Sequence, residues 1–251
     1  MPEIQWDNIK FRASSWGNLL TEPQKKEDKE AGKLSATCQK ELIKIYCQEV
    51  YGRKKDITTK QMDKGTICEP ESIQLYSMVE GRLFYKNDER VENEWFTGHP
   101  DLYIGDNIYN AEQVDDIKSS WELESFMPKL IETPDKGYEA QLNCYYSITG
   151  AQGGNLVYCL VDCPIGILEA EKLKLLRQMD VISEESPQFI KAAAELERLL
   201  TFPDIDYRER VIKIPVPRND ELIQKMKDKV PILRQWLKDF HQKHLSQYPK
   251  Q

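Results

Sequence analysis

Residues Ala111-Glu-Gln-Val-Asp-Asp-Ile-Lys118 are the stretch of this sequence that decides its fold. Their alternating pattern predicts a β-strand, in which successive side chains point to opposite faces of a sheet. Asp116 and Lys118 therefore share one face of the strand, and Ile117 points the other way, into a packed layer. We expect a carboxylate beside an ammonium group on the open face.

The composition is that of an ordinary globular protein, with 251 residues of which 40% are hydrophobic and 31% are charged. No apolar run approaches the roughly 18 residues that span a membrane, and the N-terminus has no cationic-then-apolar signal pattern. A cytoplasmic location without membrane contact is therefore expected. Six cysteines are too sparse for a disulfide scaffold, so reduced and mostly buried thiols are expected. A zinc or iron–sulfur site is the alternative.

The net charge of −7 argues against a generic nucleic-acid coat. The charge is uneven, because residues 1–65 carry a net +3 and the rest a net −10. An acidic protein still binds DNA where basic groups cluster locally and a bound cation offsets carboxylates.

The hydrophobic periodicity predicts alternating helices and strands around a mixed sheet. Helices are expected over residues 12–20 (with Ser14 or Ser15 as the cap), 35–51, 60–80, 137–149, 167–200 (interrupted around 183–187) and 219–245, and a charged loop over 22–33. Strands are expected over residues 82–86, 91–97, 101–104, 112–118, 155–161 and, at a sheet edge, 210–215. The fold class is α/β (α+β), with a central mixed β-sheet flanked by helices. One domain over 1–251 is expected, with a core at about 60–165 and a helical C-terminal extension at about 166–251.

Two further carboxylates are candidates to join Asp116. Pro100 favours extended geometry before Asp101, which then begins a strand that faces the one ending in Lys118. Acids on one face of two adjacent strands form a hard-oxygen site suited to Mg²⁺ or Mn²⁺. Glu69 falls on the inward stripe of its helix, where a carboxylate is costly without a partner. A turn-stabilising Asp101 and a helix-start Glu69 are the alternatives.

Gln141 and Tyr145 are four residues apart on a predicted helix and so share one face with Tyr138. A buried glutamine needs hydrogen-bond partners, for which a site carboxylate or a substrate phosphate is a candidate. Ordinary helix packing is the alternative. The three histidines do not cluster, so a histidine-based zinc enzyme is not expected.

Taken together, these motifs resemble the PD-(D/E)xK nuclease superfamily, and within it the phage-type alkaline exonucleases of the YqaJ and lambda exonuclease group, which are related to the RecB nuclease domain. The resemblance covers about residues 60–150, with weaker likeness at both ends. The motifs that carry it, in order, are Gly65-x-x-x-Glu69, Gly98-His99-Pro100-Asp101, Asp116-Ile117-Lys118 and Gln141-x-x-x-Tyr145.

The resemblance implies a restriction-endonuclease-like core and a 5′→3′ exonuclease that acts on double-stranded DNA. It implies a single-strand annealing protein and further copies of the chain as partners, in phage-type recombination within the host cytoplasm. It implies one or two Mg²⁺ (or Mn²⁺) ions and no iron–sulfur cluster. The implied metal ligands are Glu69, Asp101, Asp116 and the Ile117 backbone carbonyl, with Lys118 as the catalytic lysine and Gln141 and Tyr145 as the helix motif.

Basic and hydroxyl residues of the N-terminal part are weaker candidates for contacts to the DNA backbone, since a solvated charged face explains them equally well. They are Arg12, Ser14, Ser15, Lys33, Arg53, Lys54 and Lys55. Two other functions stay open: an endonuclease of the same superfamily, and a catalytically silent nuclease fold that binds DNA or a partner.

Overall fold

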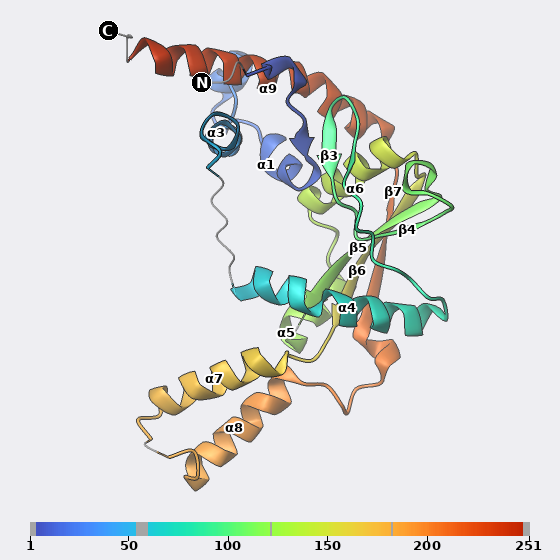
Figure 1. The fold of residues 1–251 in the computed structure, drawn as a ribbon, viewed down its shortest axis with the longest axis vertical. Helices are drawn as coiled ribbons and strands as arrows, with labels where there is room; N and C mark the ends of the chain where they lie inside the picture. The colour runs from blue at the N-terminus through green and yellow to red at the C-terminus, as the bar shows by residue number, and fades with distance from the viewer. Residues whose placement is uncertain (1–3, 54–59, 121, 182, 248–251) are drawn as a thin grey trace.

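The computed structural model describes residues 4–53, 60–120, 122–181 and 183–247, with side chains left undescribed at 60–64. Its centre is a four-stranded mixed sheet in the order β4-β5-β6-β7 (Figure 1). β5 and β6 run parallel, and the two outer strands run antiparallel to their neighbours. The strands are β4 (Leu102–Ile104), β5 (Gln113–Ser120), β6 (Gly153–Leu160) and β7 (Val211–Pro217).

Two helices cover the two faces of this sheet. On one face, α4 (Lys60–Glu80) packs Tyr76 against Ile117 of β5 and Val157 of β6. On the other face, α6 (Lys136–Thr149) packs with Val114 in the main core. The alternation of β5 thus directs odd-numbered positions toward α4 and even-numbered positions toward α6, as its sequence predicts.

A second layer of helices lies outside α6. The long helix α9 (Asp220–Ser246) buries Met226, Val230, Leu233 and Leu237 and runs along the top of the molecule beside α3 (Ala36–Tyr51) (Figure 1). A small sheet in the order β1-β3-β2 lies near the N-terminus. It comprises β1 (Phe11–Arg12), β2 (Val91–Glu92) and β3 (Phe96–Gly98). The short helix α1 (Trp16–Leu19) lies shortly after β1 in the chain.

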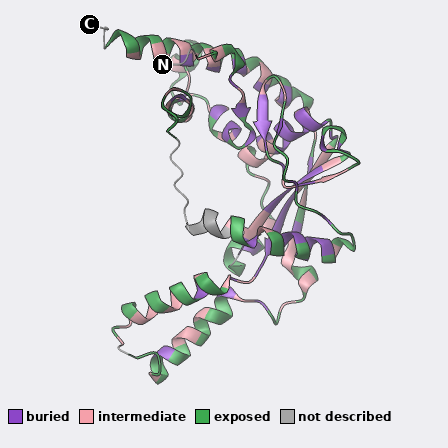
Figure 2. Ribbon diagram, viewed as in Figure 1, coloured by how far each residue is buried: buried purple, intermediate pink, exposed green. Residues whose placement is uncertain are grey.

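Two helices form a hairpin that projects from one end of the molecule. They are α7 (Ile165–Gln178) and α8 (Pro187–Leu200). Figure 2 shows that most of their surface is exposed. The hairpin buries Leu168 and Leu200 at its base, where they pack with Cys163. The interruption expected around 183–187 is therefore the turn between two antiparallel helices.

The structure confirms most of the expected elements and corrects several. The strand expected over residues 91–97 is two short strands, β2 and β3, which pair antiparallel with each other. Residues 82–86 form no strand, because the amide of Phe84 donates to the Ser77 hydroxyl (3.1 Å) rather than to a neighbouring strand. Residues 22–33 contain a short helix, α2 (Lys26–Glu30). Residues 11–12 are strand rather than helix, and a 3₁₀ turn (Ala13–Ser15) precedes α1.

The serine cap expected for this first helix is also wrong. Ser15 makes no capping hydrogen bond, because its hydroxyl donates to the Glu41 carboxylate (2.9 Å), and Ser14 lies inside the 3₁₀ turn. The C-terminal region 166–251 is not purely helical, because β7 returns to pair with β6. The division into domains stays a prediction.

The cysteines behave as expected. None of the six, all of which lie among the described residues, forms a disulfide, and every one except the partly buried Cys47 is buried. In the part of the chain that the structure describes, no helix has the length and apolar character needed to cross a membrane.

Candidate active site

The candidate site is centred on Asp116, whose side chain is 1% exposed and points from β5 toward α6. Its Oδ1 accepts a hydrogen bond from Gln141 Nε2 (2.8 Å). Its Oδ2 forms an ion pair with the Lys118 ammonium. The acid and the lysine therefore share one face of the strand, as predicted.

Asp101 lies at the edge of β5 where β4 stops pairing. β4 pairs with β5 only through residues 113–115, and Asp101, one residue before β4, accepts the next strand amide, Ile117 N, through Oδ2 (2.7 Å). In an extended strand the N–H and C=O of one residue point to the same edge. The Ile117 carbonyl, a predicted metal ligand, is thus directed to the edge on which Asp101 lies.

The charges of this group are strongly coupled. Burial first and the neighbouring Asp116 carboxylate second raise the pKa of the Asp101 carboxyl, which moves from its ordinary 3.8 to about 7 although Lys118 acts to lower it. Burial acts to lower the pKa of Lys118, but the Asp116 and Asp101 carboxylates outweigh it and raise that pKa. Lys118 is therefore a permanently charged ammonium at neutral pH.

The helix motif supplies the partners that a buried site needs. Gln141 Nε2 lies 3.1 Å from the Tyr145 hydroxyl, which in turn donates to the His99 carbonyl (3.3 Å). A Cβ atom at Gly98 would meet Tyr145 Cε1 at 2.4 Å. The absence of a side chain at Gly98 therefore makes room for the Tyr145 ring.

Glu69 has its hydrogen-bond partner outside the predicted set of site residues. Its carboxylate accepts a hydrogen bond from Lys86 Nζ (2.9 Å), although it lies near enough to raise the pKa of Asp101. Among the residues whose positions the structure describes, no three His, Cys, Asp or Glu side chains lie close enough to hold a metal as they stand. The role of Glu69 as a ligand stays a prediction.

The oxygen groups at the β5 edge nevertheless fit a magnesium ion. Mg²⁺ is commonly held by one or two carboxylates together with substrate phosphates rather than by a complete protein cage. Asp101 and Asp116 supply two hard carboxylates, and the Asp116 carboxylate raises the pKa of Asp101. A bound cation offsets such repulsion between neighbouring carboxylates.

The predicted DNA-contacting residues fall into three places. Arg12 and Ser14 are exposed beside α6, whereas Ser15 is buried and bound to Glu41. Arg53 is exposed directly after α3. Lys54 and Lys55 lie outside the described residues.

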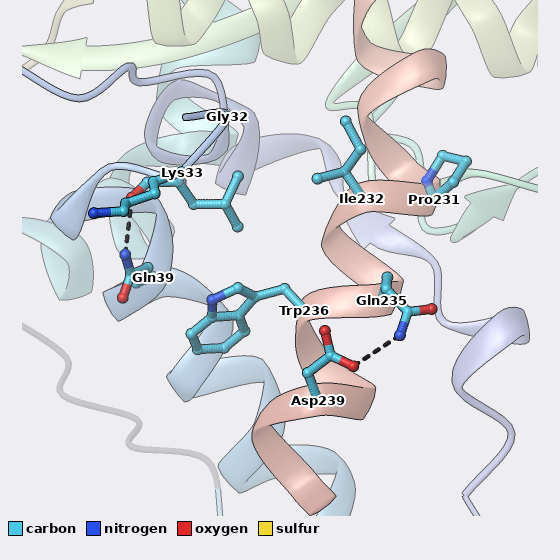
Figure 3. Close-up of a pocket in the computed structure, with 9 residues that line it drawn as sticks. Gly32, Lys33, Gln39, Pro231, Ile232, Gln235, Trp236 and Asp239 are labelled. Carbon is cyan, nitrogen blue, oxygen red and sulfur yellow. Dashed lines mark hydrogen bonds between the residues drawn. The ribbon is translucent and has the colours of Figure 1, made fainter. Parts of the chain in front are cut away.

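Lys33 lies apart from the catalytic candidates. It lines a groove of about 610 Å³ that also includes Trp236 and Ile232 of α9 (Figure 3), and it pairs with Asp28 (2.7 Å). No predicted catalytic residue lines this groove.

Sequence reasoning missed the partners of the predicted residues. Lys86, which holds Glu69, lies in the segment predicted as a strand. Asp115, which is 1% exposed, accepts from Tyr76 (3.0 Å) and from the Asn155 amide (2.7 Å), and so joins α4, β5 and β6. Its position beside Asp116 in a buried strand was the available signal, because a buried carboxylate must find donors.

Comparisons with known proteins bear on the fold. No protein-family model and no curated protein matches the sequence. Among solved structures, a phage-related exonuclease from Haemophilus somnus 129PT matches with a TM-score of 0.69 at 23% identity, covering 94% of this chain and 97% of that one.

An alkaline exonuclease (LHK-Exo) from Laribacter hongkongensis matches with a TM-score of 0.62 at 15% identity, covering 97% of this chain and 98% of that one. The same enzyme in complex with dAMP matches with a TM-score of 0.62 at 16% identity, covering 95% and 94%. Structural similarity at identities this low shows a shared fold and no more. The chain therefore has the fold of the phage-type alkaline exonucleases, the group that its motifs resemble.

Proposed function

We propose that this protein is a Mg²⁺-dependent DNA exonuclease that hydrolyses phosphodiester bonds at the ends of double-stranded DNA. The observation that carries the proposal is the meeting of Asp101, Asp116 and Lys118 at one edge of β5, where two carboxylates and an ammonium group lie together in a largely buried place. Whole-chain structural similarity to solved exonucleases, one of them in complex with dAMP, supports DNA as the substrate class.

Each residue of the site has a role in this reaction. Asp101, Asp116 and the Ile117 carbonyl would hold the ion, with Glu69 joining them after it releases Lys86. A divalent ion bound there supplies Lewis-acid activation of water and neutralises phosphate charge. Gln141 holds Asp116 in one rotamer through its Oδ1 hydrogen bond.

Lys118 supplies the positive charge of the reaction centre. Its ammonium is a compact donor on a flexible stem, which orients the attacking water and stabilises the charge that develops on the phosphoryl oxygens. The raised pKa of Lys118 keeps it protonated over the whole working range of pH. It therefore acts as a fixed cation and not as the base.

The finer assignments rest on the family resemblance. They are 5′→3′ polarity, action with a single-strand annealing protein in phage-type recombination, assembly of several copies of the chain, and residence in the host cytoplasm. Arg12 and Ser14 are the best placed of the predicted DNA contacts, because they are exposed beside the helix that carries Gln141.

The test is digestion of linear duplexes labelled at the 5′ or the 3′ end, beside a covalently closed circle, with Mg²⁺ or with EDTA. The proposal expects mononucleotide release from one end, no attack on the circle and no activity in EDTA. Cleavage of the circle would support the endonuclease alternative. Binding of DNA without any cleavage would support a silent module.

A further inference from the structure

The Lys118 ammonium contacts the ring of Tyr138, a residue of the first turn of α6 to which the proposed mechanism gives no role. The distance from Lys118 Nζ to the ring centroid is 4.9 Å. A cation within about 6 Å of an aromatic face is attracted by the ring quadrupole, more strongly where water is excluded. Lys118 is largely buried, so this contact belongs to the stronger class.

The fold around the first turn of α6 fixes the backbone that carries Tyr138. The Asp135 side chain caps α6 by accepting the Gly137 amide (2.7 Å). A Cβ atom at Gly17 would meet Gly137 Cα at 2.8 Å, so α1 and α6 are in backbone contact beside this turn. The Tyr138 side chain packs against the main hydrophobic core, which gives it a support outside the charged site.

The second partner of Lys118 is not fixed in the same way. Asp116 offers two oxygens, of which Oδ1 is taken by Gln141 and Oδ2 by Lys118. When Oδ2 is shared with a divalent ion, the attraction between Asp116 and the ammonium is weakened, because the ion neutralises the carboxylate. The Tyr138 contact is unaffected by that exchange.

We propose that Tyr138 is a positioning residue for Lys118: its ring holds the ammonium in place when Asp116 turns its charge to the metal. This inference rests on the proposed function. It predicts that the ring and not the phenol hydroxyl is required, because the quadrupole of phenylalanine also binds a cation. It also predicts that the ring supports metal binding, since without it Lys118 has no alternative to Asp116.

The experiment compares Tyr138→Phe and Tyr138→Leu with the wild type. Tyr138→Leu is expected to lower kcat by about 5- to 30-fold at an unchanged KM, the range given by a cation–π contact. Its Mn²⁺ affinity, measured by calorimetry without DNA, is expected to fall by about fivefold. Tyr138→Phe is expected to match the wild type within about twofold in both measurements.

Tyr207→Leu is the matched control. Tyr207 is equally half-buried and also lies under a cation, Arg208 Cζ at 5.2 Å from its ring, but it belongs to the turn before β7 and packs with the α4 cluster. Wild-type kcat and Mn²⁺ affinity are expected for this variant. Equal losses in Tyr207→Leu and Tyr138→Leu would contradict a specific role for Tyr138.

Three other results would overturn the proposal: wild-type kcat and Mn²⁺ affinity in Tyr138→Leu, a change confined to KM, or a Tyr138→Phe variant as impaired as Tyr138→Leu. Lys118→Ala separates this failure from failure of the proposed function. An inactive Lys118→Ala beside a fully active Tyr138→Leu contradicts only the role of Tyr138. A wild-type protein without nuclease activity contradicts the proposed function itself.

Discussion

At the scale of single residues, the site is a set of charges that burial makes interdependent. Asp101 lies close enough to Asp116 that the Asp116 carboxylate and burial together raise the pKa of Asp101, and Lys118 offsets only part of that rise. Such a cluster is poorly satisfied without a further cation. This repulsion between carboxylates favours a bound cation, and in the metal-free protein it affects how stability depends on pH.

The pH dependence of stability follows from the Asp101 pKa. Between about pH 4 and pH 7 the folded Asp101 keeps a proton that the unfolded chain has released, since its pKa rises from 3.8 to about 7 on folding. The folded state binds more protons there, so the free energy of unfolding falls as pH rises through this window and levels off above it.

Asp101→Asn is expected to flatten this fall. Part of it will remain, because burial also raises the pKa of Asp115. Urea denaturation in EDTA at pH 5, 6, 7 and 8 measures the slope, with the exposed Asp106→Asn as the control. An equal slope in Asp101→Asn and in the wild type would contradict the protonation assigned to Asp101.

At the scale of elements, the parallel pairing of β5 and β6 sets the geometry of the site. Lys118 lies opposite Tyr158 in this register, and Asp116 opposite Leu156. The pairing begins at a close approach of backbones, because a Cβ atom at Gly154 would come within 1.6 Å of the Val114 carbonyl oxygen. Only glycine fits at this position.

Gly154→Ala is therefore expected to destabilise the protein by about 3 kcal/mol, the upper part of the range for overpacking, because β6 must move away from β5. Gly153→Ala is the neighbouring control, since its added Cβ would lie 3.4 Å from the Val216 carbonyl oxygen, and a change of about 1 kcal/mol or less is expected. Chemical denaturation measures both. Equal stability of the two variants would show that the strands tolerate separation.

The elements that could be predicted from sequence are those with long, regular periodicity. α9 and β6 have clear apolar patterns, and the structure confirms both. Residues 82–86 are a short run with three apolar or aromatic residues at its centre, but only Phe84 is buried, while Leu83 and Tyr85 are 67% and 77% exposed. Such a run cannot reveal whether a partner strand is present, because that depends on residues distant in sequence.

At the scale of the whole molecule, the N- and C-terminal helices belong to the same core as the site. α9 covers α6 from outside, and its Leu233 is fully buried in the main hydrophobic cluster. The helix α6, which carries Gln141 and Tyr145, is thus held between the sheet and α9. Stability of the site should depend on packing far from it.

Leu233→Ala is expected to lower the free energy of unfolding by about 2–5 kcal/mol, since it leaves a cavity beneath α9. Ile232→Ala, one position away on the same helix, removes a side chain that is 53% exposed and is expected to cost within about 1 kcal/mol. Urea denaturation of the two variants measures both free energies of unfolding. A Leu233→Ala variant as stable as Ile232→Ala would contradict the inclusion of α9 in the core.

The parts of the site that could be predicted from sequence are pairs of residues close together in the chain. Asp116 and Lys118 share a face by strand periodicity alone, and Gln141 with Tyr145 by helical periodicity. Their long-range partners could not be predicted, because Lys86 reaches Glu69 and Tyr138 reaches Lys118 through tertiary packing. The same limit applies to Glu69, whose approach to the other acids depends on how α4 lies on the sheet.

The most direct test of the proposed active site is Mg²⁺-dependent hydrolysis of linear duplex DNA by Lys118→Ala, with Lys172→Ala as the control. Lys172 is also a partly buried, ion-paired lysine, but it bridges Glu169 and Glu197 in the α7–α8 hairpin. With both variants shown to be folded by thermal melting, Lys118→Ala is expected to lose about 100-fold or more of the rate, and Lys172→Ala to keep wild-type activity. Near-normal hydrolysis by folded Lys118→Ala would contradict the active site described for this fold.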